Sequence, residues 1–380
     1  MNLHLLGGKH LMNCKNLRIS LKIFILISVA ILSTVSLMCG SQTSEEYCTS
    51  HQCFAVPPTG QTRCYYDYIW FDCPASRSDP YWGQDAQFPK ARTLTCSGGP
   101  CSTSAAVENE IVTDSLIGLV WQRALPSVYD GCTKGATEGS LCNWQEAKNY
   151  CENLEYGGQN DWRLPNIFEL QSIVDHQRCE PAIDSTVFPD TTSSDTWSSS
   201  SHLIKFRYED TDSAWCISYT EGTTCRRIKS SHEKYYGGNT RCVRGGPQYT
   251  QPIINRYIIA ESVSGQKVVT DSITGIMWQG NYIADKTWQE ALNYCALLTY
   301  GGYSDWRLPN KNELLSLFNS FKRSPASDFP DMQQDVHEFW SSTTKAHYTV
   351  HAWTGDFLYG YASSSAKTDK QNVRCVRLGP

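Results

Sequence analysis

Seventeen cysteines give the chain most of its capacity for redox or metal chemistry. Cys14 and Cys39 lie within or next to an apolar amino-terminal segment, and the others are spread through the body of the chain. A thiolate can bind zinc, but these spacings do not form the clean two-by-two cluster of a structural zinc site. So many cysteines in an exported chain instead indicate disulfides.

No residue pattern in the sequence matches a complete catalytic site. The nine histidines recur at no matched position of the internal repeat described below, and no Ser-His-Asp or His-Glu-x-x-His signature appears. Cys179 has no counterpart in that repeat, so it is the obvious candidate for a free reactive thiol. We therefore expect that the protein is not an enzyme and needs no cofactor.

One cluster of basic residues could bind an anionic ligand: Arg226, Arg227, Lys229 and Lys234. The alternative is an ordinary solvated hairpin, which the sequence favours. The formal net charge is −5, and it becomes −9 without residues 1–38, which hold four basic residues and no acidic one. An acidic chain is a poor general binder of polyanions, so we expect no nucleic-acid partner.

Two other polar motifs recur along the chain. Arg163 and Arg307 lie in the motif Asp-Trp-Arg-Leu-Pro, and we expect them to bond carbonyl or carboxylate groups within the fold. Asp190 and Asp331 each follow Phe-Pro and are candidate calcium ligands. Calcium needs several oxygen ligands, and a single loop aspartate does not supply them, so a structural role is the stronger expectation.

These motifs belong to an internal repeat in which residues 111–247 return as 268–380. The sequence Asp-Trp-Arg-Leu-Pro-Asn occurs intact in both copies, at 161–166 and 305–310. Ten of the twelve tryptophans form five matched pairs: Trp121 and Trp278, Trp144 and Trp288, Trp162 and Trp306, Trp197 and Trp340, Trp215 and Trp353. The unit is too long for a solenoid repeat, so each copy should be a domain with its own core.

Each copy contains the same order of expected elements. Capping boxes, in which a cap side chain and a Glu three residues later bond each other's backbone N–H groups, mark two helix starts per copy. The boxes are Asn143 with Glu146, Asn166 with Glu169, Thr287 with Glu290, and Asn310 with Glu313. A strand precedes the helices and short β-type runs follow them, which predicts an α+β fold with two helices and a small antiparallel sheet per domain.

The repeat also suggests how the cysteines pair. The second copy has only Cys295 and Cys375, so we expect these two to form a bridge, and the matching pair in the first copy is Cys151 with Cys242. Local pairing is the simplest expectation for the others: Cys132 with Cys142, Cys216 with Cys225, and, in sequence order, Cys48 with Cys53, Cys64 with Cys73, and Cys96 with Cys101.

The amino terminus has the layout of a signal peptide. Arg18 and Lys22 precede an apolar run, and no charge follows until Glu45. The alternative is a retained membrane anchor, because the uncharged stretch is nominally long enough to span a bilayer. Cys39 is a candidate lipidation site, although Met38 stands where a small residue is usual, and plain secretion is the alternative.

The motif set Val-Thr-Asp-Ser, Asp-Trp-Arg-Leu-Pro-Asn and Arg-Cys-Val-Arg resembles the DUF1566 family, which includes the carboxy-terminal domain of the Legionella collagen-like adhesin. Both copies match, and together they cover about two-thirds of the chain. Arg-Leu-Pro-Asn and Arg-Cys-Val-Arg are also distantly similar to the formylglycine-generating, sulfatase-modifying type of C-type-lectin-like fold. That similarity implies two tandem C-type-lectin-like domains, which is an analogy at the level of the fold.

The targeting segment, the repeat and the resemblance together give the following expected organisation: a signal peptide at 1–38, a Cys-rich region at 39–108, domains of the resembled family at 109–247 and 266–380, and a linker at 248–265. It implies a cell-surface adhesin that binds carbohydrate or another extracellular polymer, since the adhesin domain is linked to sulfated glycosaminoglycans. The alternatives are a structural envelope component with a protein partner and, less favoured, a formylglycine-generating type of enzyme. In each case membrane contact would come only from the signal segment or a lipid anchor.

Overall fold

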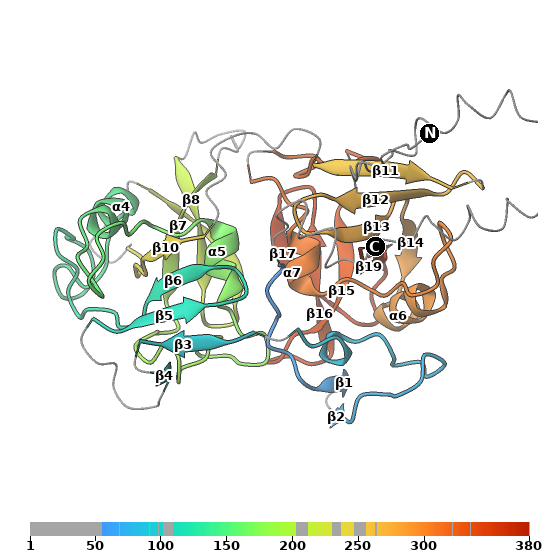
Figure 1. The fold of residues 1–380 in the computed structure, drawn as a ribbon, viewed down its shortest axis with the longest axis horizontal. Helices are drawn as coiled ribbons and strands as arrows, with labels where there is room; N and C mark the ends of the chain where they lie inside the picture. Colours follow the sequence, from blue (N-terminus) through green and yellow to red (C-terminus); the bar gives the residue numbers. More distant parts are fainter. Residues whose placement is uncertain are drawn as a thin grey trace, which may run out of the picture. The chain divides into compact units, whose positions relative to one another are not determined.

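A computed structural model describes residues 55–380 except 68, 91, 98, 102–108, 203–211, 230–236, 247–255, 263, 321, 335 and 380. All of these residues belong to the compact unit Ser44–Pro380 (Figure 1). The predicted signal segment, Cys39 and the Cys48–Cys53 pair lie outside the described residues. Within the described part of the chain, no helix is both long and apolar enough to cross a membrane.

Each repeat contains an antiparallel sheet built on its Val-Thr-Asp and Trp-Gln motifs. The strand order is β10-β6-β5-β3-β4 in the first repeat and β11-β12-β13-β19 in the second. The first sheet comprises β3 (Leu94–Cys96), β4 (Gly99–Pro100), β5 (Ile111–Asp114), β6 (Leu119–Gln122) and β10 (Val243–Gly245). The second comprises β11 (Tyr257–Glu261), β12 (Lys267–Asp271), β13 (Ile276–Gln279) and β19 (Val376–Leu378). Trp121 and Trp278 are buried at equivalent central positions of the two sheets.

A second sheet in each repeat carries the remaining tryptophan motifs. In the first repeat it has the order β7-β8-β9, with β7 (Asp195–His202), β8 (Ser213–Ser218) and β9 (Thr223–Ile228). In the second repeat the order is β14-β18-β15-β16-β17, with β14 (Ile283–Lys286), β15 (Glu338–Thr344), β16 (His351–Asp356), β17 (Tyr361–Ala366) and β18 (Gln371–Val373). The pairing is interrupted at the same place in both sheets, between Trp197 and Ser201 and between Trp340 and Thr344.

Four α-helices accompany these sheets: α4 (Trp144–Glu152), α5 (Ile167–Ser172), α6 (Trp288–Leu297) and α7 (Lys311–Leu315). Each begins with a reciprocal capping box at the residues where the sequence predicted one. The described chain is nevertheless mostly β, and each repeat has two sheets, so the prediction of one small sheet per domain was too simple. The second helix of each repeat is only about one to two turns long, because the chain after it turns back toward the sheets.

A buried hydrogen-bond frame recurs in both repeats. Gln122 accepts a hydrogen bond from the backbone of Cys242 at 3.2 Å and donates one to Tyr150 at 2.9 Å. Gln279 makes the same two bonds in the second repeat. Arg241 donates to the carbonyl of Gln122, and the equivalent arginine does so in the second repeat. Since buried polar groups destabilise a fold unless they are paired, these residues are structural.

Six disulfides lie within the described residues, and their pairs are the ones that the sequence suggested: Cys64–Cys73, Cys96–Cys101, Cys132–Cys142, Cys151–Cys242, Cys216–Cys225 and Cys295–Cys375. The two matched bridges each join the first helix of a repeat to its last strand region. They close long loops, with sequence separations of 91 and 80 residues, and therefore restrict the unfolded chain strongly.

The described part of the Cys-rich region contacts both repeats. Its strands β3 and β4 extend the first sheet of the first repeat, whereas its earlier part packs on the second repeat (Figure 1). That earlier part contains β1 (Cys64–Tyr66), β2 (Ile69–Phe71) and a 3-10 turn, η2 (Asp85–Gln87). Gln61 exchanges two hydrogen bonds with the backbone of Thr344, at 3.0 and 3.1 Å, and Asp85 accepts one from Thr343 at 2.7 Å.

Candidate functional site

The edge strands β9 and β17, one from each repeat, lie next to each other, and the backbone N–H of Ala362 donates a hydrogen bond to Thr224 at 3.1 Å. Beside this contact is a pocket of about 330 Å³, which we call the aromatic–arginine pocket. Its lining consists of His202, Trp215, Thr224, Cys225, Arg226, Tyr359 and Tyr361. Neither repeat alone supplies this set of side chains.

The aromatic rings of the pocket come from both repeats. The rings of His202 and Trp215 meet edge to face, with centroids 4.7 Å apart, and both side chains are buried. Tyr359 and Tyr361 lie on either side of a glycine, half-buried, with nearly parallel rings 6.1 Å apart. Such rings offer flat apolar faces and, in the tyrosines, hydroxyl groups, a combination that suits the face and edge of a sugar ring.

Two guanidinium groups give the pocket positive charge. Arg226 of the first repeat lines it, and Arg323 of the second repeat lies over the ring of Tyr359, 4.9 Å from the centroid. Burial, together with the positive charges of Arg226 and Arg323, lowers the pKa of His202 to about 4. His202 is therefore neutral at pH 7, and both arginines lie close enough to influence it. An anionic group could bind between them.

The basic cluster predicted from the sequence is not one surface. Successive residues of a strand point to opposite faces, so Arg226 and Arg227 diverge. Arg227 pairs with Asp195, and Lys229 pairs with Asp212 at 2.7 Å and lies over the ring of Trp144 at 4.3 Å. Lys234 lies outside the described residues. Only Arg226, then, is placed in the pocket.

Sequence reasoning missed the other members of the pocket. His202, Tyr359 and Tyr361 have no matched counterparts of the same type in the repeat, and Arg323 lies in a turn without a motif. The pair of tyrosines around Gly360 was a local signal, since a glycine between two aromatic residues often marks an exposed turn. The convergence itself depends on the packing of one repeat on the other, which no local pattern reveals.

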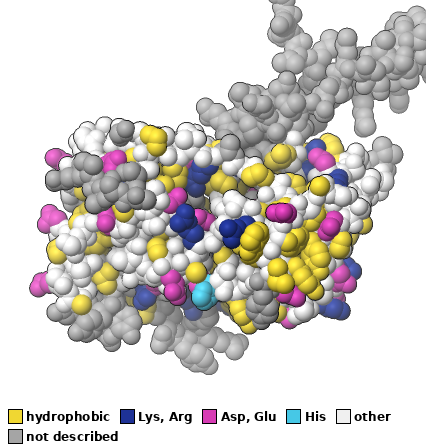
Figure 2. Space-filling model, turned by 90° about the horizontal axis from the view of Figure 1, so that it is seen from below, with side chains coloured by type: hydrophobic (Ala, Val, Ile, Leu, Met, Phe, Trp, Pro, Cys, Tyr) yellow, Lys and Arg dark blue, Asp and Glu magenta, His cyan; other side chains and the backbone are white. Residues whose placement is uncertain are grey.

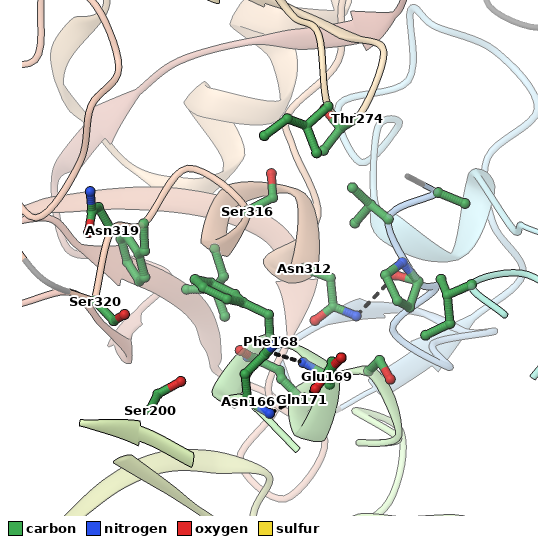
Figure 3. A pocket seen from close by; sticks show the side chains of 18 of the residues that line it. Asn166, Phe168, Glu169, Gln171, Ser200, Thr274, Asn312, Ser316, Asn319 and Ser320 are labelled. Atoms are coloured by element: carbon green, nitrogen blue, oxygen red, sulfur yellow. Dashed lines mark hydrogen bonds between the residues drawn. The ribbon is translucent and has the colours of Figure 1, made fainter. Parts of the chain in front are cut away.

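A larger cavity of about 640 Å³, the inter-repeat cavity, opens between α5 and α7 (Figure 3). Its wall combines apolar side chains, such as Phe168 and Phe318, with hydroxyl and amide groups. Residues from the first repeat include Asn166, Phe168, Gln171, Ser172 and Ser199–Ser201, and those from the second include Thr274, Asn312, Leu315, Ser316 and Asn319. It lies within the 300–1,000 Å³ range of small-ligand sites.

The arginines of the Asp-Trp-Arg-Leu-Pro motif pair with the capping glutamates. Arg163 makes two hydrogen bonds to Glu169, at 2.6 and 2.7 Å, and Arg307 makes two to Glu313, both at 2.7 Å. Each glutamate also accepts from its cap residue's backbone. The pair fixes the turn that leads into the second helix, which is the structural role expected from the sequence.

The described residues offer little for metal or nucleophilic chemistry. Asp195, Cys216 and Cys225 bring three potential metal-ligating atoms within 4.8 Å of one another, but the two cysteines form a disulfide. Neither Asp190 nor Asp331 joins such a group among the described residues. Cys179 is a free thiol whose pKa is raised by burial and by Glu180 and Glu221, the opposite of what an activated nucleophile requires.

One strongly apolar surface lies on the β1–β2 hairpin. Tyr66, Ile69 and Trp70 are 48%, 66% and 56% exposed. Figure 2, which views the molecule from below, shows hydrophobic side chains gathered toward the part of this face where the hairpin lies. Large exposed apolar patches on soluble domains often mark contact surfaces.

Comparison with known protein families gives a result that agrees with the repeat. The model of the family described as the Lcl C-terminal domain matches residues 110–244 and again residues 267–377. The two matches coincide with the two structural repeats and together account for more than half of the chain. No curated protein matches the chain.

Proposed function

The chain belongs to the Lcl C-terminal domain family, of which it carries two copies, and we propose that it is a surface adhesin that binds an acidic extracellular polysaccharide. The aromatic–arginine pocket is the proposed site. Sulfate or carboxylate groups of the polymer bind to Arg226 and Arg323, and sugar rings pack on Tyr359 and Tyr361. The family and the six disulfides of the described residues fit a protein at the cell surface or outside the cell.

The observation that carries the proposal is an aromatic pocket that Arg226 lines, with a second arginine, Arg323, stacked on the ring of its Tyr359. The chain is acidic overall, with a formal net charge of −5, which disfavours general polyanion binding. A local site can still bind an anion, because charges at hydrogen-bonding distance outweigh a distant and screened net charge. Burial lowers the pKa of His202 most, and the nearby charges of Arg226 and Arg323 lower it further.

The test measures binding of the purified mature chain to immobilised heparin, hyaluronan and dextran across a salt series. Heparin carries sulfate, hyaluronan carries only carboxylate, and dextran is neutral. We expect salt-sensitive binding to the acidic polymers, weakened about three- to tenfold by Arg226→Ala or Arg323→Ala. Arg63→Ala is the control, because Arg63 is an exposed arginine in the distant β1–β2 region.

An independent readout comes from His202. A bound anion offsets the positive charge of Arg226 and Arg323, so the pKa of His202, now about 4, should rise when heparin fragments bind. Nuclear magnetic resonance titration of this histidine measures the change. The proposal fails if the folded chain binds no acidic polymer, or if Arg226→Ala and Arg63→Ala behave alike.

The exposed β1–β2 hairpin supports a second candidate function, that of an envelope component with a protein partner. Trp70, the most exposed tryptophan of the described chain, and Ile69 would form its contact surface. A partner that co-purifies with the chain and is lost on Trp70→Ala, together with an absence of polysaccharide binding, would favour this function.

No catalytic step forms part of the proposal. The thiol chemistry of a formylglycine-generating enzyme would need reactive cysteines in the second repeat, and Cys295 and Cys375 are joined in a disulfide. The C-type-lectin-like architecture of each repeat stays a prediction. Its proposed relevance is that it would place variable loops around a rigid, disulfide-linked core.

A further inference from the structure

The second helices of the two repeats present equivalent surfaces with different neighbours. In the second repeat, α7 and the end of β15 are covered by the chain's own extended segment 57–61. Asn312 donates to the carbonyls of Pro57 and Pro58 at 3.1 and 3.2 Å. Gln61 bonds the backbone of Thr344, as described above. In this repeat the surface therefore already binds a polypeptide, mainly through backbone groups and amides.

In the first repeat the equivalent positions line the inter-repeat cavity. Phe168 corresponds to Asn312, and Ser200 and Ser201 correspond to Thr343 and Thr344. Phe168 is 40% exposed. Figure 3 shows its side chain among those that line the cavity. The cavity also touches the covered surface, because Ala55, Val56 and Pro57 form part of its wall. It is thus continuous with an interface that holds an extended segment.

Two buried polar groups in the cavity wall have no hydrogen-bond partner among the described residues. They are the Nε2 atom of Gln171 and the Oγ atom of Ser172, on side chains that are only 4% and 3% exposed. A buried amide donor without a partner costs about 1–3 kcal/mol of stability, so such a group calls for an explanation. Because both atoms are closed off from solvent, each side chain must rotate toward the cavity before a ligand carbonyl can accept its hydrogen bond.

The charged side chains of the cavity wall are already paired. Glu169 bonds Arg163, Arg256 bonds Asp271 at 2.7 Å, and Asp328 bonds Asn319 at 2.5 Å and pairs with Lys322. Both signs are present, and each is compensated within its own repeat. This arrangement favours an uncharged ligand over an anionic one.

We propose that the inter-repeat cavity binds an extended, uncharged, proline-containing polypeptide segment of a protein partner, much as the equivalent surface of the second repeat binds residues 57–61. The side chain of Phe168 packs against the apolar side of the segment, since flat rings pack well on proline. On binding, the side chains of Gln171 and Ser172 rotate toward the cavity and donate to the backbone carbonyls of the segment. The site is separate from the aromatic–arginine pocket and does not depend on polysaccharide binding.

The test uses an acetylated and amidated peptide with the sequence of residues 55–62, AVPPTGQT, labelled with a fluorophore. Fluorescence anisotropy with the full mature chain should show saturable binding with a dissociation constant below about 1 mM. Phe168→Ala should weaken binding about fivefold or more. Tyr348→Ala is the matched control, because Tyr348 is also an exposed aromatic residue, in a turn of the second repeat.

A second variant guards against misfolding. Gln171→Leu introduces the residue that the second repeat has at this position, Leu315. It should weaken peptide binding, leave the circular dichroism spectrum unchanged, and not lower the melting temperature, because it removes an unpaired buried amide. A peptide with glutamates in place of both prolines should bind more weakly. Arg226→Ala should leave peptide binding unaltered, so a failure here is distinct from a failure of polysaccharide binding.

Three outcomes would overturn the inference. The first is no saturable binding of the neutral peptide by the folded chain, and the second is binding that neither Phe168→Ala nor Gln171→Leu weakens. The third outcome is preferential binding of dextran oligosaccharides that the same two variants weaken. The last outcome would identify the cavity as a neutral-sugar site.

Discussion

The same arginine–glutamate pair occurs in both repeats in opposite surroundings. The side chains of Arg163 and Glu169 are 27% and 14% exposed, whereas those of Arg307 and Glu313 are 6% and 0% exposed. The motif Asp-Trp-Arg-Leu-Pro-Asn and the glutamate are the same in both repeats, but only the second pair is covered by the amino-terminal region. The ring of Phe88 lies 4.9 Å from the guanidinium of Arg307, and Lys90 lies 3.7 Å from Glu313. Identical motifs therefore make identical bonds, but their energetic weight depends on what the rest of the chain places over them.

The largest expected effect is the loss of stability when the arginine of the buried pair is removed, compared with the loss at the partly exposed pair. Arg307→Ala leaves Glu313 buried without its main partner and should lower the free energy of unfolding by about 3–5 kcal/mol. Arg163→Ala breaks a partly solvated pair and should cost about 1 kcal/mol. Urea unfolding followed by tryptophan fluorescence measures both. Equal losses would show that coverage by residues 57–90 does not strengthen the motif.

The next prediction concerns pH, because the covered surface contains Asp85. Burial raises the pKa of Asp85 to about 6, despite hydrogen bonds from Thr59 and Thr343. The folded state thus binds this proton more tightly than the unfolded state, so the contribution of Asp85 to stability falls as pH rises from about 4 through 6. Asp85→Asn should remove this decline.

The expected difference between the pH profiles of the wild type and Asp85→Asn is on the order of 2 kcal/mol between pH 4 and 7. Thermal unfolding at several pH values measures this difference. A wild-type profile parallel to that of Asp85→Asn would contradict the assignment.

Glu313 changes stability with pH in the opposite direction. Pairing with Arg307 lowers the pKa of Glu313 to about 2, and that stabilisation is lost as pH falls below about 4.5.

The smallest expected effect concerns two equivalent variants, one in each repeat, whose free energies of unfolding should not differ. Arg244 bonds Asp161 and Arg377 bonds Asp305, and both aspartates are more than half exposed. Exposed pairs contribute at most about 1 kcal/mol, so Arg244→Ala and Arg377→Ala should each have a small and similar cost. A large cost for one of them would mean that the repeats differ beyond the covered surface.

Local sequence determined much of the framework. In each of the four capping boxes the two partners are three residues apart in sequence, so the box forms within a single turn of backbone. The paired bridges Cys151–Cys242 and Cys295–Cys375 followed from the repeat, since each copy has its own pair. These features depend on short-range chemistry or on a comparison of the two copies.

The candidate sites could not be predicted in the same way. Of the pocket residues, the sequence named Arg226 alone as a candidate ligand-binding residue, since it marked Trp215 only as a repeat position and Cys225 only as a disulfide cysteine. It also grouped Arg226 with Arg227, which strand geometry turns to the other face. Arg323 and Tyr359 meet His202 only because β9 and β17 lie together. Packing between elements far apart in the chain has no signature in a single sequence. For the same reason, the sequence did not predict that residues 57–90 pack over the Arg307–Glu313 pair.

The packing of residues 57–90 on the second repeat has a consequence for the order in which parts of the chain can fold. Asp85 and Thr343 bond each other across 258 residues of sequence. At a synthesis rate of about 5–20 residues per second, roughly 13–50 seconds separate the production of the two partners. Asp85 and the residues around it, which are made early, can therefore complete their packing only after the end of β15 has been made.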